Sequence, residues 1–390
     1  MATNLLRTAW TQLDSHELRL LLDDRIGGPG QYDNRGANPH RIHLPLAGAE
    51  CRITLTYSRQ AIVSVEPGPT FDQTQWDAIA EEIESKVLNG PEKIGREYSF
   101  CSHLVSGSWR GDRSGVQILP PHPQSPTAPV ECADHPFILE FPIRDSGFWP
   151  ITNHRRMREH RRLTHMLNTV LAGRMSVQNS RRLGHSWCCF RRADGELEVR
   201  WVQNTYFGQL GQCVLDTLSP QSAERVEVIP ADRYLKEVLG IDGRGLRVPS
   251  DLDESICHYQ QLPPVCREKF DRAAYWLDIA SRQWTISMSS SFGSLVSAVE
   301  SLINQRGRGS TARFRNFLVQ YAPGASLEAR RNEMYDLRSG IFHGSDLMTL
   351  DQDISFGWDP PGWNERELHE ELWGLTRTVI RNWLRNPPPN

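Results

Sequence analysis

An arginine and a histidine stand five positions apart near the end of a helix-favouring segment, in the stretch RSGIFHG at positions 338–344. Arginine is a permanent cation whose planar fork of N–H donors matches the shape of a phosphate. Histidine is the side chain whose proton moves most easily near neutral pH. Arg338 and His343 could therefore hold a phosphodiester and transfer protons while it is cleaved.

Helix geometry decides how these side chains could meet. Positions five apart are separated by about 140° around an ideal helix and about 7.5 Å along it, so Arg338 and His343 do not stack but could converge on a phosphate in a groove. Ser339 lies four residues before His343 on the same face, so its hydroxyl could orient the imidazole. Gly344 occupies a helix C-cap position, which places His343 in the last turn, where the helix dipole favours its protonated form.

The reaction that suits this pair is RNA cleavage without a metal, in which the ribose 2′-hydroxyl attacks the adjacent phosphorus. His343 would act as general base or acid, a role that contributes about 10²–10⁴-fold. Arg338 would stabilise the charge on the phosphoryl oxygens. One histidine cannot be base and acid at the same moment, so a homodimer that supplies a second His343 is expected. Glu300, in a preceding helical segment, could fix Arg338 or assist the proton transfer.

Composition sets wider limits on the function. The chain has 390 residues, of which 38% are hydrophobic and 23% charged. This length predicts more than one domain, and the apolar content excludes wholesale disorder. The net charge of −3 gives no global positive field, so contact with RNA must come from local basic patches.

Targeting and metal-binding patterns are absent from the sequence. No apolar run reaches the length of a membrane span, and the N-terminus becomes charged at Arg7, too early for a secretory signal. The sequence therefore predicts a cytoplasmic protein with no membrane contact. The eight cysteines are scattered without paired two-residue spacing, which predicts free thiols rather than a zinc site. His40 and His43 find no local third ligand, and neither a metal nor a cofactor is predicted.

The first 264 residues have an α+β pattern. A hairpin is expected from strands at 52–57 and 61–65, followed by a helix over 74–88. Further strands are expected at 98–105, 116–119 and 137–143, and a second hairpin joins 187–190 to 197–202 through the turn at 193–195. We predict an α+β region over 1–264, with room for two subdomains.

After Leu262-Pro263-Pro264 only helical periodicity remains. The apolar stripes predict five helices, around 270–280, 295–303, 314–318, 326–343 and 365–384, with Ser326 as the N-cap of the fourth. Short connections between amphipathic helices favour an antiparallel bundle. The second predicted domain therefore spans 265–390.

The fourth helix carries a specific resemblance. Its sequence Tyr335-Asp336-Leu337-Arg338-Ser339, followed by His343-Gly344, resembles the signature of the HEPN domain superfamily in its ApeA-like branch. The preceding helices fit in order, with FDRA at 270–273 in the first and AVESL at 298–302 in the second, so the resemblance covers roughly 266–384. It implies a helical bundle that dimerises. It also implies metal-independent endoribonuclease activity at an interfacial cleft, with arginine and histidine from both protomers, and a role in bacterial anti-phage defence or stress response.

Other interpretations stay open at this point. The same groove could belong to a non-catalytic module that binds RNA or a nucleotide. Arg338 could pair with Glu333 or Asp336, leaving His343 as an ordinary helix-terminal histidine. The α+β region would sense a trigger or restrain the nuclease, and an unknown trigger or inhibitor could act through it.

Two basic clusters are candidates for RNA contact. The run at 154–162 contains five arginines and one glutamate, and Arg155 and Arg156 within it could follow a phosphate backbone. The alternative is a solvated helix face, or arginines paired with acidic segments elsewhere. The second cluster lies inside the helical domain and could grip RNA beside the cleft, although a solvated loop would also explain it; it consists of Arg306, Arg308, Arg313 and Arg315.

Overall fold

A computed structural model of the protein describes residues 4–27, 30–33, 38–122, 135–172, 175–177, 185–192, 194–203, 211–238, 245–284, 286–303, 310–324, 328–352 and 360–388. The chain divides into two compact units. Unit 1 comprises Met1–Gly95, Pro142–Glu159 and Val214–Thr217. Unit 2 comprises Arg96–Phe141, His160–Cys213 and Leu218–Asn390.

This division differs from the boundary predicted after Pro264. The C-terminal helices lie in the same compact unit as the central strands. The proline pair marks only a turn between two helices, α5 (Leu252–Gln261) and α6 (Pro264–Gln283). Proline at the start of a helix is readily accommodated, because the first N–H groups have no intrahelical partner in any case.

Unit 1 contains a four-stranded antiparallel sheet in the order β1-β2-β3-β4. Its strands are β1 (Gln31–Asp33), β2 (His40–Leu44), β3 (Ile53–Ser58) and β4 (Ala61–Pro67). The predicted hairpin is confirmed as β3 and β4, which pair from Ile53 with Pro67 to Ser58 with Ala61. Alternate residues of β3 are buried, which gives the sheet one apolar face.

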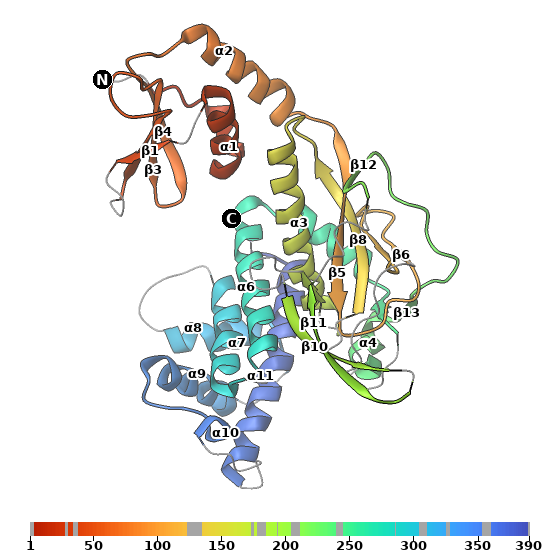
Figure 1. The fold of residues 1–390 in the computed structure, drawn as a ribbon. Coiled ribbons are helices and arrows are strands. Elements are labelled where there is room, and N and C mark those ends of the chain that lie inside the picture. The colour runs from red at the N-terminus through yellow and green to blue at the C-terminus, as the bar shows by residue number, and fades with distance from the viewer. Residues whose placement is uncertain are drawn as a thin grey trace. The chain divides into compact units, whose positions relative to one another are not determined.

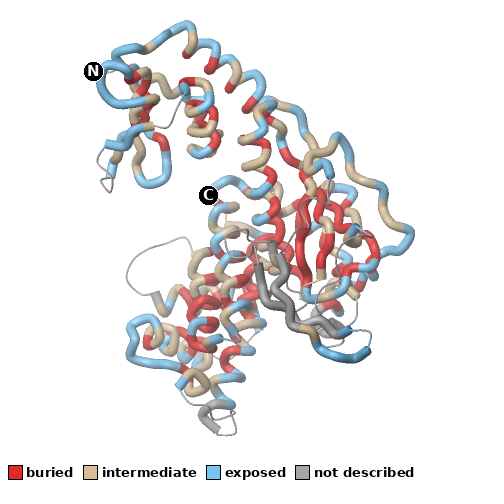
Figure 2. Tube along the Cα trace, viewed as in Figure 1, coloured by how far each residue is buried: buried red, intermediate tan, exposed pale blue. Residues whose placement is uncertain are grey.

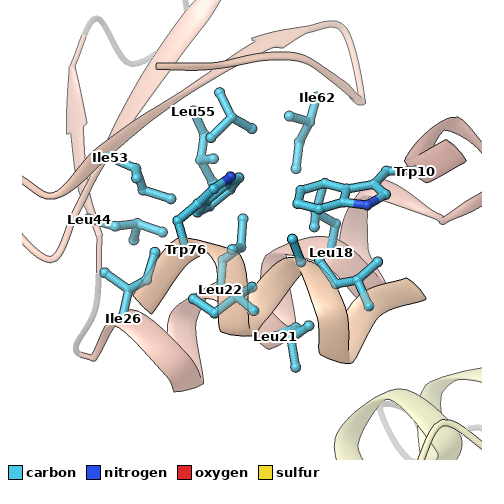
Figure 3. Packing of buried hydrophobic residues seen from close by; sticks show 14 of the residues in the cluster. Trp10, Leu18, Leu21, Leu22, Ile26, Leu44, Ile53, Leu55, Ile62 and Trp76 are labelled. Atoms are coloured by element: carbon cyan, nitrogen blue, oxygen red, sulfur yellow. The ribbon is translucent and has the colours of Figure 1, made fainter. Parts of the chain in front are cut away.

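Two helices cover this apolar face. They are α1 (Ser15–Ile26), capped by Asp14, and α2 (Gln73–Glu82), capped by Asp72 and extended by a π-helical turn at Ile83–Val87. The helix predicted over 74–88 is thus confirmed. Trp10 and Trp76 meet in the core with ring centroids 5.5 Å apart, surrounded by aliphatic side chains from both helices and the sheet (Figure 3).

The central sheet contains β12, β5, β8, β7 and β6 in that order, and β9 also pairs with β5. The strands are β5 (Glu92–Cys101), β6 (Trp109–Arg110), β7 (Gln117–Leu119), β8 (His135–Arg144), β9 (Met175–Val177) and β12 (Val214–Leu215). Buried residues are concentrated along β5 and β8 (Figure 2). The strands predicted near 98–105, 116–119 and 137–143 are confirmed as β5, β7 and β8.

The basic run forms part of a long helix, α3 (Trp149–Val170). In unit 2 this helix packs on the central sheet, because His160 bonds Ser99 at 2.6 Å and stacks on Phe141. The second predicted hairpin is confirmed as β10 (His185–Arg191) and β11 (Leu197–Gln203). A parallel pair, β13 (Glu227–Ile229) and β14 (Arg247–Pro249), and the helix α4 (Ala231–Val238) complete the strand-containing part.

The C-terminal part is helical (Figure 1), as predicted. After α6 come α7 (Met288–Leu302), α8 (Ser310–Tyr321), α9 (Glu328–His343), α10 (Thr349–Gln352) and α11 (Pro360–Arg385). Helix α7 is the most apolar and packs against α6, α9 and α11. Ser326, the predicted N-cap of the fourth helix, lies outside the described residues. Within the described residues, no helix combines the length and the apolar character that crossing a membrane requires.

Buried polar contacts fasten these helices to the rest of unit 2. Asp278 of α6 is 3% exposed and accepts hydrogen bonds from Asn168 of α3 at 3.1 Å and from Arg282 at 2.8 Å. The buried Arg377 of α11 donates to the carbonyl of Leu171, just after the end of α3. A cation at a helix C-terminus is favoured by the helix dipole. The helical part therefore does not stand apart from α3.

His369 of α11 is a buried histidine in the helical core. Its Nε2 lies 2.8 Å from the hydroxyl of Ser291, which itself donates to the carbonyl of Ala280 at 2.9 Å. The hydroxyl proton is therefore used, and Nε2 must carry the imidazole proton. The rings of Trp284 and Trp373 lie beside it. Burial lowers the pKa of His369 to about 4.

The free energy of unfolding should therefore fall as the pH falls from about 6.5 towards 4, because the unfolded chain takes up a proton that folded His369 refuses. Replacing His369→Phe keeps an aromatic ring and removes this linkage. Between pH 7 and pH 5 the free energy of unfolding should fall in both proteins. The fall should be about 2 kcal/mol smaller in the variant than in wild type. Thermal unfolding at both pH values measures the difference. Parallel loss in the two proteins would contradict it.

Candidate functional site

The end of α9 forms the predicted helix C-cap. Its last residue is His343, and Gly344 follows with φ +72°, the left-handed conformation that favours glycine. The backbone N–H groups of Ser345 and Asp346 both donate to the carbonyl of Gly340, at 3.0 and 3.2 Å. The chain therefore turns back on the helix immediately after the histidine.

Arg338 is anchored by a carboxylate on a neighbouring helix. Its Nη2 lies 2.8 Å from Oε2 of Glu300 in α7, so the contact expected between these two residues is present. The guanidinium also lies over the rings of Tyr335 and Phe342, with 5.7 and 4.7 Å from Cζ to the ring centroids. Arg338 is half-buried, and its single hydrogen bond within the described residues goes to Glu300.

The proposed pairing of Arg338 with Glu333 or Asp336 is wrong. Glu333 instead accepts hydrogen bonds from Arg330 at 3.2 Å and from Asn364 of α11 at 3.2 Å. The exposed Asp336 makes no ion pair with Arg338. A cross-helix carboxylate holds Arg338 because α9 turns that face towards α7.

His343 is exposed at the end of the helix. Its imidazole makes no hydrogen bond or ion pair with any described residue, and the expected hydrogen bond from Ser339 is not formed. Residues four apart on a helix have Cβ atoms about 5–6 Å apart, a gap that the short serine side chain does not close here. Arg338 is thus fixed and His343 is open to a substrate or to another chain.

Three exposed apolar side chains, which we call the apolar surface, come from the residue stretch before α7, the end of α9 and the segment after His343; they are Ile286, Phe342 and Leu347. These side chains are 82%, 53% and 53% exposed. Phe342 lies against Gly293 of α7, where an added Cβ would come within 2.9 Å of the ring. Large exposed apolar side chains are typical of a surface that contacts a partner when they form one patch.

The segment after His343 is attached to the start of α7. Asp351 accepts hydrogen bonds from the hydroxyl of Ser287 and from the backbone N–H groups of Met288 and Ser289, at 2.7–2.9 Å. Burial alone would raise the pKa of the Asp351 carboxyl, but these donors outweigh it and hold the pKa below its ordinary value. Asp351 therefore serves as a long-range cap of α7 and fixes the chain that leaves the site.

The basic run does not offer the two predicted arginines to RNA. Arg155 makes an ion pair with the buried Glu17 at 2.6 Å and donates to the carbonyl of Val87 at 3.0 Å. Arg156 is 1% exposed and donates to Asn153 at 2.6 Å. The prediction that Arg155 and Arg156 contact RNA is therefore withdrawn, because a phosphate cannot reach side chains that are already engaged inside unit 1. The alternative, pairing with a distant acidic segment, is what Arg155 adopts.

The second basic cluster is only partly described. Arg306 and Arg308 lie outside the described residues. Arg313 and Arg315 are half-buried on α8, which packs against α9. Their role in RNA contact stays a prediction. No group of three or more His, Cys, Asp or Glu side chains in the described parts of the chain is arranged to hold a metal ion.

Sequence reasoning missed two residues that shape the site, Asp346 and Asp351. The carboxylate of Asp346 lies against Gly340, so closely that an added Cβ would collide with it. The signal for this contact was a glycine inside a helix, where it is otherwise unfavourable. No local signal marks Asp351, because its partners are more than sixty residues away.

Comparison with known proteins gives no relative: no family model, no curated protein and no solved structure matches this chain.

Replacing Gly340→Ala should lower the free energy of unfolding by about 1 kcal/mol, because overpacking against Asp346 outweighs the gain in helix propensity. In an Asp346→Gly background, which removes every side-chain atom close to the added Cβ, the same replacement should be neutral or stabilising. Thermal unfolding of wild type, the two single variants and the double variant completes a double-mutant cycle. Equal effects in both backgrounds would show that the close approach of Asp346 does not constrain the turn after His343.

Proposed function

We propose that the protein is a metal-independent endoribonuclease of the HEPN type that acts as a homodimer. One observation carries the proposal: an anchored arginine and an exposed histidine that bonds none of the described residues lie on the last turns of one helix. Arg338 is fixed by Glu300 at 2.8 Å, whereas His343 is exposed beside it. Fixed cations and titratable imidazoles are the two groups that cleavage of a phosphodiester requires.

The mechanism follows from these two side chains. The ribose 2′-hydroxyl attacks the adjacent phosphorus, the 5′-oxygen leaves, and a 2′,3′-cyclic phosphate remains. His343 removes the proton from the 2′-hydroxyl or supplies one to the 5′-oxygen. Arg338 uses one of its five N–H donors for Glu300, and its other Nη group can bind a phosphoryl oxygen. Glu300 holds the guanidinium in place, which limits the reorganisation needed when charge develops.

A second copy of the chain supplies the second proton-transfer group. Base and acid must act on opposite sides of the phosphorus, and a single His343 cannot do both. A two-fold axis through the apolar surface of Ile286, Phe342 and Leu347 would bring two His343 side chains to one cleft and bury these residues. The exposure of this surface in a single chain supports such a contact.

The resemblance of the helical part to ApeA-like HEPN domains favours a role in bacterial anti-phage defence or stress response, in the cytoplasm. RNA would be the substrate, with Arg313 and Arg315 of α8 among its contacts. The strand-containing part of the chain would then carry the response to a trigger or an inhibitor.

A non-catalytic RNA- or nucleotide-binding module is the second candidate. Two observations favour it: Arg338 is already neutralised by Glu300, and no described side chain orients His343. In that case a phosphate would bind in the same place without being cleaved.

Purified protein should cleave single-stranded RNA in EDTA and leave 2′,3′-cyclic phosphate ends. His343→Gln should reduce the rate by about 10²–10⁴-fold, and Arg338→Gln by a similar factor. Arg366→Gln, an exposed substitution on α11, is the control and should retain full activity. Product ends can be identified by mass spectrometry. Equal cleavage by His343→Gln, or RNA binding without cleavage, would contradict the enzyme and favour the binding module.

Replacing Ile286→Asp should convert the dimer to a monomer and abolish cleavage, because a charge would be buried at the two-fold contact. Ile286 is 82% exposed in the single chain, so the folded monomer should tolerate the change. Val265→Asp, at a 57% exposed position on α6, is the matched control. Sedimentation velocity and the cleavage rate measure both effects. A dimeric, active Ile286→Asp protein would place the interface elsewhere.

A further inference from the structure

Unit 1 contains an open hollow of about 700 Å³ that none of the preceding functions uses. Ligand sites commonly have volumes of about 300–1,000 Å³. The hollow lies where the turn after β2, the start of β3 and the start of α2 come together. Its lining residues are Pro45, Glu50, Arg52, Thr70, Asp72 and Gln75.

The wall of the hollow is built directly on the core of unit 1. Arg52 precedes the buried Ile53, and Gln75 precedes the buried Trp76; both core residues appear in Figure 3. Neighbouring residues of extended chain point to opposite faces, which applies to Arg52 and Ile53. Neighbouring residues of a helix are about 100° apart around its axis, which applies to Gln75 and Trp76 of α2. A core side chain therefore fixes the direction of its polar neighbour.

Hydrogen bonds hold the polar wall still. Arg52 Nη1 donates to Gln75 Oε1 at 3.2 Å and to the carbonyl of Ile26 at 3.4 Å. Gln75 Nε2 in turn donates to the carbonyl of Arg25 at 2.8 Å. The guanidinium thus has a defined position before any ligand arrives, which lowers the entropic cost of binding.

Two further lining residues, Thr70 and Asp72, are fixed in the same way. The Thr70 hydroxyl bonds the carbonyls of Glu50 and Cys51, each at 3.1 Å. Asp72 Oδ1 caps α2 by accepting from the backbone N–H groups of Thr74 and Gln75, at 2.9 and 3.2 Å. The cap leaves Asp72 Oδ2 available.

The charges in this hollow are of both signs and are not paired with one another. No ion pair joins Arg52 to Glu50 or Asp72, and the Glu50 carboxylate makes no hydrogen bond with a described residue. Here the anchoring of Arg52 and Asp72 keeps them apart, and each retains unused hydrogen-bonding capacity.

We propose that this hollow binds a small zwitterion, with an ammonium group between Glu50 and Asp72 and a carboxylate on Arg52. A simple anion would be repelled by the two carboxylates, and a simple cation would gain nothing from Arg52. A free amino acid and a short peptide share the required chemistry. The volume of the hollow exceeds that of one amino acid, so a di- or tripeptide fills it better.

The full-length protein can be titrated by calorimetry with glycine, diglycine and triglycine, using putrescine and succinate as cation-only and anion-only probes. Diglycine and triglycine should bind and raise the temperature of unfolding, with glycine weaker and the two single-charge probes inactive. Tighter binding of glycine than of the peptides would identify a free amino acid as the ligand and overturn the peptide assignment.

Two substitutions test the pose without disturbing the wall. Glu50→Gln removes an unengaged carboxylate, and Asp72→Asn removes charge while keeping an N-cap oxygen. Each should weaken peptide binding about tenfold or more, whereas Glu81→Gln, on the exposed side of α2, should not. The proposal is overturned if no zwitterion binds at millimolar concentrations, if putrescine binds equally well, or if the Glu50 and Asp72 variants bind as wild type does.

Discussion

The ion pair between Arg338 and Glu300 is the contact on which the candidate site depends. A half-buried guanidinium is costly without a partner, and the carboxylate that neutralises it comes from α7, thirty-eight residues earlier in the chain. The pair therefore fixes both the rotation of α9 against α7 and the direction of Arg338. Because Phe342 packs on Gly293 of the same helix, the end of α9 is held from two sides.

The same contact sets a chemical condition. While Glu300 holds Arg338, the net charge of the pair is zero, so a phosphate must be attracted by the donors that remain and by groups from elsewhere. Among the described residues of its own chain, His343 has no partner that orients it. The site in one chain is therefore incomplete, because its cation is neutralised and its imidazole is not oriented. Contact with a second copy of the chain would supply the missing groups. Asp351 matters here because it fixes the chain beyond the histidine.

The organisation of the rest of the chain follows from buried polar contacts between distant segments. Asp278 accepts hydrogen bonds from side chains of α3 and α6. Arg377 donates to the carbonyl of Leu171, just after the end of α3. The helical part is therefore continuous with the central sheet in one compact unit. In unit 1 an apolar core surrounds Trp10 and Trp76, and a buried ion pair joins Glu17 of α1 to Arg155 of α3.

The sequence by itself determined the local elements and the C-terminal end of the site helix. Apolar residues at helical or alternating spacing identify these elements because the period of burial is a local property, and Gly344 marks the end of α9 because only glycine readily adopts positive φ there. Tertiary structure alone decided the partners of the charges. A basic run does not show that Arg155 will find Glu17 inside unit 1, nor does a helix show which carboxylate will reach Arg338. Electrostatic partners are set by proximity in space, which no local pattern encodes.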